Sequence, residues 1–152
     1  MAKIATLEEL QNGMEFYLQN LGSGSYVTAF PQNNKALHAA SDHIGIEIYF
    51  KFEKFGLTND IFFLKSTYHN CNVSAIGEGW PLLPTLSTDI NWQKFKFRKA
   101  ADGISINIQT AHPKLKITDP IWVSVIGEPR ILRVAENTPR LEWSYFIPYL
   151  RE

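Results

Sequence analysis

The sequence predicts an all-β fold made of three imperfect copies of one unit, and three observations lead to it. The first is a pentapeptide that occurs twice, as Phe-Lys-Phe-Glu-Lys at residues 50–54 and as Phe-Lys-Phe-Arg-Lys at residues 95–99. Its alternation of aromatic and polar residues is the period of a strand with one buried face. The second is the interval of 45 residues between the two pentapeptides, since a chain of 152 residues has room for three such units. The third is the content of rings, 10 Phe, 6 Tyr and 4 Trp, which favours strands.

The first two copies share a common spacing ahead of their pentapeptides. Leu18 is followed nine residues later by Val27, and Leu64 is followed at the same distance by Val73. Each copy therefore reads as strand, turn, strand, longer loop, strand and closing strand. The whole chain, residues 1–152, is predicted to form one domain, with copies at about 14–59, 60–103 and 104–150.

The third copy is weaker but in register. Residues 105–109 alternate, and Ile117 follows Ile108 by nine residues, which predicts a second strand around position 117. The copy is expected to close with Trp-Ser-Tyr-Phe at residues 143–146, where the others have Phe-Lys-Phe.

Turn-forming residues separate the predicted strands, and one short helix is expected. The turns are predicted at residues 22–25, 68–70, 102–103 and 112–114. The helix falls within residues 3–12, because Thr6 can cap it, Glu9 lies three residues later and Gly13 can end it.

Three four-strand units with aromatic closing strands indicate a β-trefoil with pseudo-threefold symmetry. In such a closed arrangement no sheet edge is left exposed. The alternating rings should then point inward and form core rather than a binding surface; they are Phe50, Phe52, Phe95, Phe97, Trp143 and Tyr145. The apolar residues 146–150 are expected to close the barrel, with contact to a second chain in a homodimer as the alternative.

One segment resembles the agglutinin domain of the amaranthin family. It runs from Asp60 through the Lys65-Ser66 entry to the turn at 68–70, and continues with Val73-Ser74, Asn91-Trp92 and Phe95-Lys96. Members of that family are plant lectins without signal peptides that bind glycans containing galactose or N-acetylgalactosamine. The resemblance implies a carbohydrate-binding lectin whose partners are glycans or glycoproteins.

The resemblance also points to a sugar site in the loop at residues 76–81. Trp80 is the expected stacking platform, and Glu78, between Gly77 and Gly79, can accept from two hydroxyls. Asn70, in the preceding turn, completes the expected site. The family has asparagine and tyrosine where this chain has residues 77–79, which leaves galactose-type specificity a separate question. The alternative is that Trp80 fills the gap between two copies and Glu78 is a solvated loop acid.

Several other classes of function find no support in the sequence. The 15 basic and 15 acidic residues give zero net charge, and no basic stripe is visible along the chain, which argues against nucleic acid or an anionic membrane as partner. The N-terminus is acidic where a signal peptide is apolar, and no apolar run is long enough to span a bilayer, so we expect a cytoplasmic protein without membrane insertion. The four histidines and Cys71 show no metal-type or catalytic spacing, so no metal, cofactor or enzymatic activity is expected.

Two hypotheses about function remain. The first is a lectin, which a glycan array tests. The second is a β-trefoil protein-interaction module, such as a protease inhibitor or an adaptor, since a rigid barrel can present variable loops. A protein partner that free sugars cannot displace favours the second.

Overall fold

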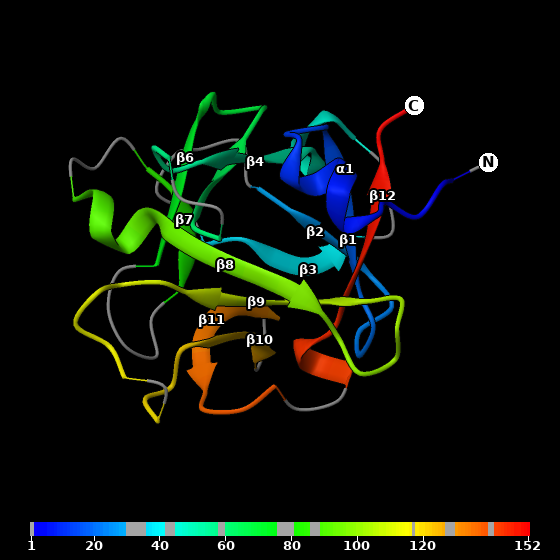
Figure 1. Cartoon of the computed structure of the whole chain (residues 1–152). Helices are drawn as coiled ribbons and strands as arrows, with labels where there is room; N and C mark the ends of the chain where they lie inside the picture. Colours follow the sequence, from blue (N-terminus) through cyan, green and yellow to red (C-terminus); the bar gives the residue numbers. More distant parts are fainter. Residues whose placement is uncertain are drawn as a thin grey trace.

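The structure is a computed structural model in which residues 2–29, 36–41, 45–57, 60–75, 81–85, 89–116, 118–126, 130–139 and 142–152 are described. Within these ranges it holds twelve strands, one α-helix and three 3₁₀ helices (Figure 1). The strands are β1 (Phe16–Asn20), β2 (Tyr26–Thr28), β3 (His38–Ser41), β4 (Phe50–Lys54), β5 (Phe62–Ser66), β6 (Cys71–Ala75), β7 (Leu82–Pro84), β8 (Lys94–Lys99), β9 (Ile106–Thr110), β10 (Trp122–Ile126), β11 (Ile131–Glu136) and β12 (Phe146–Leu150). The helices are α1 (Leu7–Gln11), η1 (Ile46–Ile48), η2 (Ile90–Gln93) and η3 (Glu142–Ser144).

Six of the strands pair in a closed antiparallel ring. The order is β1, β4, β5, β8, β9 and β12, and β12 pairs again with β1. Because the ring is closed, it leaves no unpaired edge for another chain. The prediction that residues 146–150 close the barrel is confirmed, since β12 pairs with both β1 and β9.

The other six strands form three hairpins. They are β2–β3, β6–β7 and β10–β11, and each follows a strand of the ring along the chain. Three inward-facing valines in these hairpins, Val27, Val73 and Val123, are fully buried. Period-two alternation therefore places one face of each hairpin on the same core as the ring.

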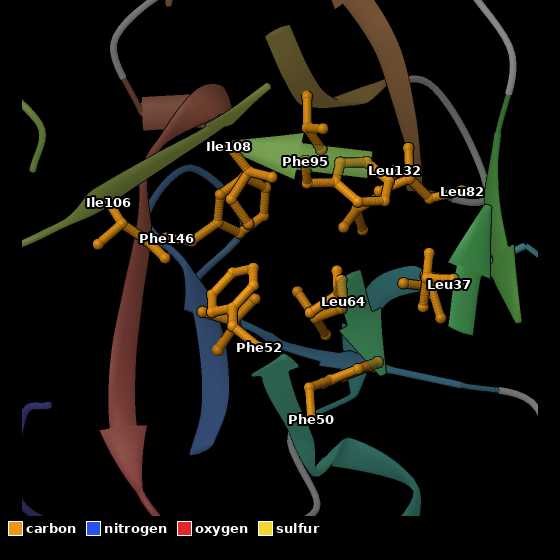
Figure 2. Close-up of a cluster of buried hydrophobic side chains, with 14 of the residues drawn as sticks. Leu37, Phe50, Phe52, Leu64, Leu82, Phe95, Ile106, Ile108, Leu132 and Phe146 are labelled. Carbon is orange, nitrogen blue, oxygen red and sulfur yellow. The ribbon is translucent and has the colours of Figure 1, made fainter. Parts of the chain in front are cut away.

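The core combines phenylalanine rings from the alternating strands with leucine, isoleucine, valine and alanine side chains. Phe50, Phe52 and Phe95 are completely buried, as the sequence predicts, and the ring of Phe52 stacks 4.1 Å from that of Phe97. Figure 2 shows side chains of β4, β5, β8, β9 and β12 converging on this centre. Burial of each such ring contributes about 1.5–3 kcal/mol, which is why the pattern fixes the strands so firmly.

The N-terminal helix forms as the sequence predicts. Thr6 accepts from the backbone N–H of Glu9, and the Glu9 carboxylate accepts from the backbone N–H of Thr6, which is a complete capping box. The helix ends before Gly13, whose φ of +78° suits glycine. Both termini lie on one side of the molecule in Figure 1, where the backbone N–H of Leu150 donates to Lys3.

The predicted closing strand at residues 143–146 is wrong by three residues. Trp143 lies in η3 and is 43% exposed, Tyr145 is only half-buried, and the strand begins at Phe146. The physical reason is that side chains distant in sequence donate hydrogen bonds to the backbone carbonyls of this segment. The buried amide of Asn20 donates to the carbonyl of Trp143 at 3.1 Å, and that of Asn107 donates to Ser144 at 2.9 Å.

Trp143 is held on the surface by a glycine rather than in the core. A Cβ atom at Gly22 would lie 2.6 Å from Cδ2 of the indole, so only glycine lets the ring approach this closely. The backbone N–H of Gly22 also donates to the carbonyl of Glu142 at 2.8 Å. The indole therefore covers the turn after β1, and the prediction that it is a core residue is wrong.

The second strand of the third copy also begins later than predicted. Ile117 lies outside the described residues, and the strand that follows β9 is β10, which starts at Trp122. Residues 111–121 therefore form a connection much longer than the turns at 21–25 and 67–70, which join β1 to β2 and β5 to β6. The predicted turn at residues 112–114 is present inside it, closed by a bond from the N–H of Leu115 to the carbonyl of His112.

Candidate functional site

The sugar site expected from the sequence lies mostly outside the described residues. Gly77, Glu78, Gly79 and Trp80 all belong to the segment 76–80. For these four residues the expectation remains a prediction.

Asn70 is the one expected site residue that the structure describes. It is exposed at the end of the predicted turn between β5 and β6, with a φ of 52°. This left-handed conformation is one that asparagine tolerates, so the turn itself explains why the residue is there. Two residues of the same turn, Thr67 and Tyr68, line an open hollow of about 500 Å³.

The long connection between β9 and β10 creates a different site. A groove of about 410 Å³ lies between this connection and the outer faces of β8 and β9, and we refer to it as the lysine groove. The described residues that line it are Ile61, Lys94, Lys96, Gln109, Thr110, Ala111, His112, Pro113, Leu115, Lys116 and Ile121.

Backbone hydrogen bonds fix both ends of the connection to the sheet. At one end the N–H of Ala111 donates to the carbonyl of Lys94 at 2.8 Å. At the other, Ile121 accepts from the N–H of Thr110 at 2.8 Å. Between them, the Asp119 carboxylate accepts from the N–H of Lys116 at 2.7 Å. Hydrogen bonds therefore fix the described part of the loop that forms the wall of the groove.

All the charged residues among the described lining of the groove are lysines. Lys94 and Lys96 point outward from β8, because the alternating Phe95 is buried, and Lys116 comes from the connection. Lys96 pairs with Asp60 at 3.4 Å, and the Lys94 ammonium lies 4.2 Å from the centre of the Phe55 ring. Gln109 is the cross-strand neighbour of Lys96. The groove thus presents several hydrogen-bond donors on one side.

A buried hydroxyl in the groove lining lacks a partner. Thr110 is 2% exposed, and its Oγ1 atom makes no hydrogen bond within the described part of the chain. An unsatisfied buried polar atom costs free energy, so such an atom in a native fold calls for an explanation. A groove ligand does not supply it, because Thr110 pairs with Phe95 and lies with Ile106 and Ile108 on the inward face of β9.

A histidine and a tryptophan form the ring pair of the groove. The ring of His112 lies 4.2 Å from that of Trp92, which precedes β8, and the Nδ1 atom of His112 accepts from the N–H of Lys114. Burial lowers the pKa of His112, and Lys114 and Lys94 lower it further, while Asp89 acts in the opposite direction. The imidazole is therefore neutral at pH 7 and offers a largely apolar face.

A second surface, formed by tyrosine rings, lies where β1, β2 and β12 meet. Here the ring of Tyr17 lies within 5.2 to 6.0 Å of the rings of Tyr26, Tyr49 and Tyr149, and we refer to these four residues as the tyrosine face. A smaller hollow of about 230 Å³ lies against Tyr17 and Tyr49. Burial raises the pKa of Tyr17 and of Tyr149, so both phenols stay neutral.

The polar groups of the tyrosine face bind one another. Tyr149 donates through its hydroxyl to Gln19 at 3.2 Å, and the amide of Gln19 donates to the carbonyl of Gly24. Arg151 lies 4.1 Å over the ring of Tyr49 and pairs with Glu15 at 2.9 Å. Rings are plentiful at this surface, and the Tyr149 hydroxyl and the Arg151 guanidinium both have partners.

Three further observations concern other kinds of site. Within the described ranges, no group of three or more metal-ligating side chains comes together. The helices of the described segments are all too short or too polar to cross a bilayer. Cys71 is buried, and burial raises the pKa of its thiol, which is the setting of a structural cysteine rather than a nucleophile.

The closed ring of strands with three hairpins is the architecture of a β-trefoil. The lysine groove lies on its outer wall. Solved structures share this fold at low sequence identity. A β-trefoil protein named BEL, in an apo crystal form, is similar with a TM-score of 0.70 and 12% identity, over 91% of this chain and 93% of that chain.

The lectin of Polyporus squamosus is also similar in structure. Its TM-score is 0.70 at 10% identity, over 90% of this chain and 48% of that chain, and it was solved with the human-type influenza-binding epitope Neu5Aca2-6Galb1-4GlcNAc. No protein-family model and no curated protein sequence matches the chain. At these identities the likeness shows the fold alone.

Sequence reasoning missed the lysine groove for two identifiable reasons. The basic residues of β8 alternate with phenylalanines, so they form no run in the sequence, yet they share one outward face. The groove wall comes from the connection after β9, whose length was underestimated because Ile117 fits the spacing of the other copies. The usable signal was the charge pattern inside the second pentapeptide.

Proposed function

We propose that the protein is a carbohydrate-binding lectin, built as a β-trefoil of three imperfect four-strand copies, and that the lysine groove is a sugar site. The observation that carries this proposal is the groove itself: an open hollow that combines fixed hydrogen-bond donors with apolar contact surface. Sites of this kind bind a sugar through its hydroxyls and through the apolar face of its ring.

The groove supplies both kinds of contact. Gln109, which faces outward beside Lys96, can donate and accept. Pro113, Leu115 and Ile121 supply apolar contact surface. A shallow site of this size is suited to a single saccharide unit, for which affinities in the millimolar range, about −4 kcal/mol, are expected.

The loop of Gly77, Glu78, Gly79 and Trp80, with Asn70, stands as a second candidate sugar site. Its support is the resemblance to amaranthin-like agglutinins, which also suggests galactose- or N-acetylgalactosamine-type glycans as ligands. The two sites are separate proposals, because the groove is argued from described residues and the loop residues 77–80 lie outside them.

A glycan array with the folded protein at high concentration tests the lectin proposal. A set of reproducible hits is expected, and they should disappear in Gln109→Ala if the groove binds them, or in Trp80→Ala if the second site does. Gln19→Ala is a matched control, since Gln19 occupies in β1 the position that Gln109 occupies in β9.

Two results would overturn the proposal. One is an array without any hit above background for protein whose thermal transition shows it to be folded. The other is a stoichiometric protein partner that free sugars fail to displace, which would favour the interaction-module hypothesis instead.

A further inference from the structure

We propose that the ligand of the lysine groove is an acidic saccharide, one that carries carboxylate or sulfate groups; this inference rests on the proposed lectin function and specifies its ligand. A neutral sugar needs donors and acceptors of both kinds, whereas the charged lining residues that the structure describes are three ammonium groups, on Lys94, Lys96 and Lys116. Ammonium groups only donate, and they favour anionic oxygen atoms.

The cationic surface continues along β8 beyond the groove. Lys94, Lys96 and Arg98 alternate with buried or partly buried phenylalanines, so all three point outward. Successive outward residues of a strand are about 6.6–6.8 Å apart, which arranges the charges in a row. A chain of acidic sugar units fits such a row better than a single ion does.

Aromatic rings hold two members of this row in place. The guanidinium of Arg98 lies 4.6 Å from the ring centre of Trp122, and the ammonium of Lys94 lies 4.2 Å from that of Phe55. Contact with a ring face limits the freedom of a cation without neutralising its charge. The cost of ordering these side chains on binding is therefore lowered.

The acids near the row leave most of its charge available. Asp60, which pairs with Lys96, has a side chain that is 68% exposed, and an exposed pair of this kind is weak and easily exchanged. Asp119 accepts from the backbone of Lys116 in its own turn, and Asp89 accepts from the backbone of Asn91.

The equivalent strand β4 shows what a neutralised version looks like. Its pentapeptide differs from that of β8 at one charged position, where Glu53 stands in place of Arg98. The Glu53 carboxylate pairs with Lys51 at 3.6 Å and with Lys65 of β5 at 3.5 Å. One carboxylate thus pairs with two lysines, one on β4 and one on β5. On β8 the position of Glu53 holds the cation Arg98 instead.

This single difference provides the experiment. Binding of a heparin-derived tetrasaccharide, of sialyllactose and of lactose is measured by calorimetry for the wild type, Arg98→Glu, Lys94→Ala/Lys96→Ala and the control Lys51→Ala/Lys65→Ala. The control also removes two positive charges, but from β4 and β5 instead of β8. Thermal midpoints verify folding, and Arg98→Gln replaces Arg98→Glu if the latter is unstable.

The acidic tetrasaccharide or sialyllactose is expected to bind at least tenfold more tightly than lactose. Arg98→Glu and the Lys94/Lys96 variant should each bind it at least tenfold more weakly, while the control keeps wild-type affinity. Removing a cation that binds an anionic group of the ligand should also lower the slope of log K against log salt by about one. Sialyllactose carries a carboxylate as its single anionic group, so tight binding of this probe assigns carboxylate as a sufficient recognised group.

Other outcomes separate the two proposals. Lactose bound as tightly as the acidic probes, without effect of salt or of Arg98→Glu, would overturn the acidic ligand and leave the lectin standing. Absence of all saccharide binding would overturn both. Competition by a single-stranded DNA oligomer at the same concentration as the tetrasaccharide would also overturn the inference, since the row would then bind any polyanion.

Discussion

The lysine groove and the tyrosine face are two surfaces of one barrel, and they differ in the charge that they present. On the tyrosine face the Tyr149 hydroxyl binds Gln19, and Arg151 is held by Glu15 and by the Tyr49 ring. In the groove three lysines line the surface, of which Lys96 pairs with the exposed Asp60 and Lys94 contacts the Phe55 ring.

The two surfaces also differ in the length of the connection beside them. Beside the tyrosine face, β1 and β2 are joined by a short turn at residues 21–25, which lets neighbouring side chains close over one another. Beside the groove, the connection between β9 and β10 is longer, and several of its described residues line the hollow. Abundance of aromatic residues is thus a weaker guide to a candidate site here than charged side chains beside a long connection.

The largest expected effect separates the two surfaces by their role in stability. Tyr17 is buried at the centre of three other rings, so Tyr17→Ala should lower the free energy of unfolding by about 3–5 kcal/mol. Lys116→Ala, in the exposed wall of the groove, should change it by less than about 0.5 kcal/mol. Urea denaturation measures both. Similar losses in the two variants would contradict the assignment of one surface to structure and the other to binding.

A pair of threonine substitutions should give opposite signs. Thr110→Val removes a buried hydroxyl without a described partner and should raise the free energy of unfolding by up to about 1 kcal/mol. Thr67→Val removes a hydroxyl that donates to the carbonyl of Tyr49 at 3.1 Å, and should lower it by about 1 kcal/mol. Chemical denaturation compares them; a loss of stability in Thr110→Val would mean that its hydroxyl is satisfied in the folded protein.

The hydrogen bond between Tyr149 and Gln19 should contribute about 1 kcal/mol. Tyr149→Phe keeps the ring that stacks on Tyr17 and removes only the hydroxyl. Thermal unfolding should show the loss, and glycan binding by the groove should be unchanged. Loss of glycan binding in this variant would move the sugar site to the tyrosine face.

The smallest effect is a pH dependence from His112. Its pKa is lowered in the folded protein from an ordinary value of 6.5, chiefly by burial, so the unfolded chain binds the proton more readily. This contribution to stability is complete above pH 6.5 and is lost as the pH falls through the folded pKa. His112→Gln should therefore lose less stability than the wild type between pH 7.5 and pH 5.

A second histidine contributes to the same window. Burial also lowers the pKa of His38, so part of the pH dependence should remain in His112→Gln. Free energies of unfolding from urea titrations at the two pH values measure the difference. An identical pH dependence of the variant and the wild type would show that His112 titrates as freely in the folded protein as in the unfolded chain.

The fold could be predicted to a large extent because it depends on local patterns. The burial of Phe50, Phe52 and Phe95 follows from the period of a strand, in which every second residue faces the core. The capping box of Thr6 and Glu9 is a signal of four residues. The errors occur where side chains distant in sequence intervene. The positions of Trp143 and Tyr145 depend on amides of Asn20 and Asn107, which no local pattern contains.

The candidate site was less predictable than the fold. The sequence directed attention to Trp80, in a segment that lies outside the described residues, and to Asn70, which ends a turn. The lysine groove combines β8, β9 and the connection after it, and its lining extends from Ile61 to Ile121. Such a combination depends on strand pairing across the barrel, which single-strand patterns leave open.

The sequence by itself determined the alternating strands, their turns and the composition of the core, because burial of a periodic apolar face is a local and energetically dominant requirement. Only the tertiary structure decided that Lys96 of the second pentapeptide lines a groove while Glu53 of the first pairs with Lys65 of the neighbouring strand. The physical reason is that the pairing of charges and polar atoms depends on which strands become neighbours. That neighbourhood exists only once the ring has closed.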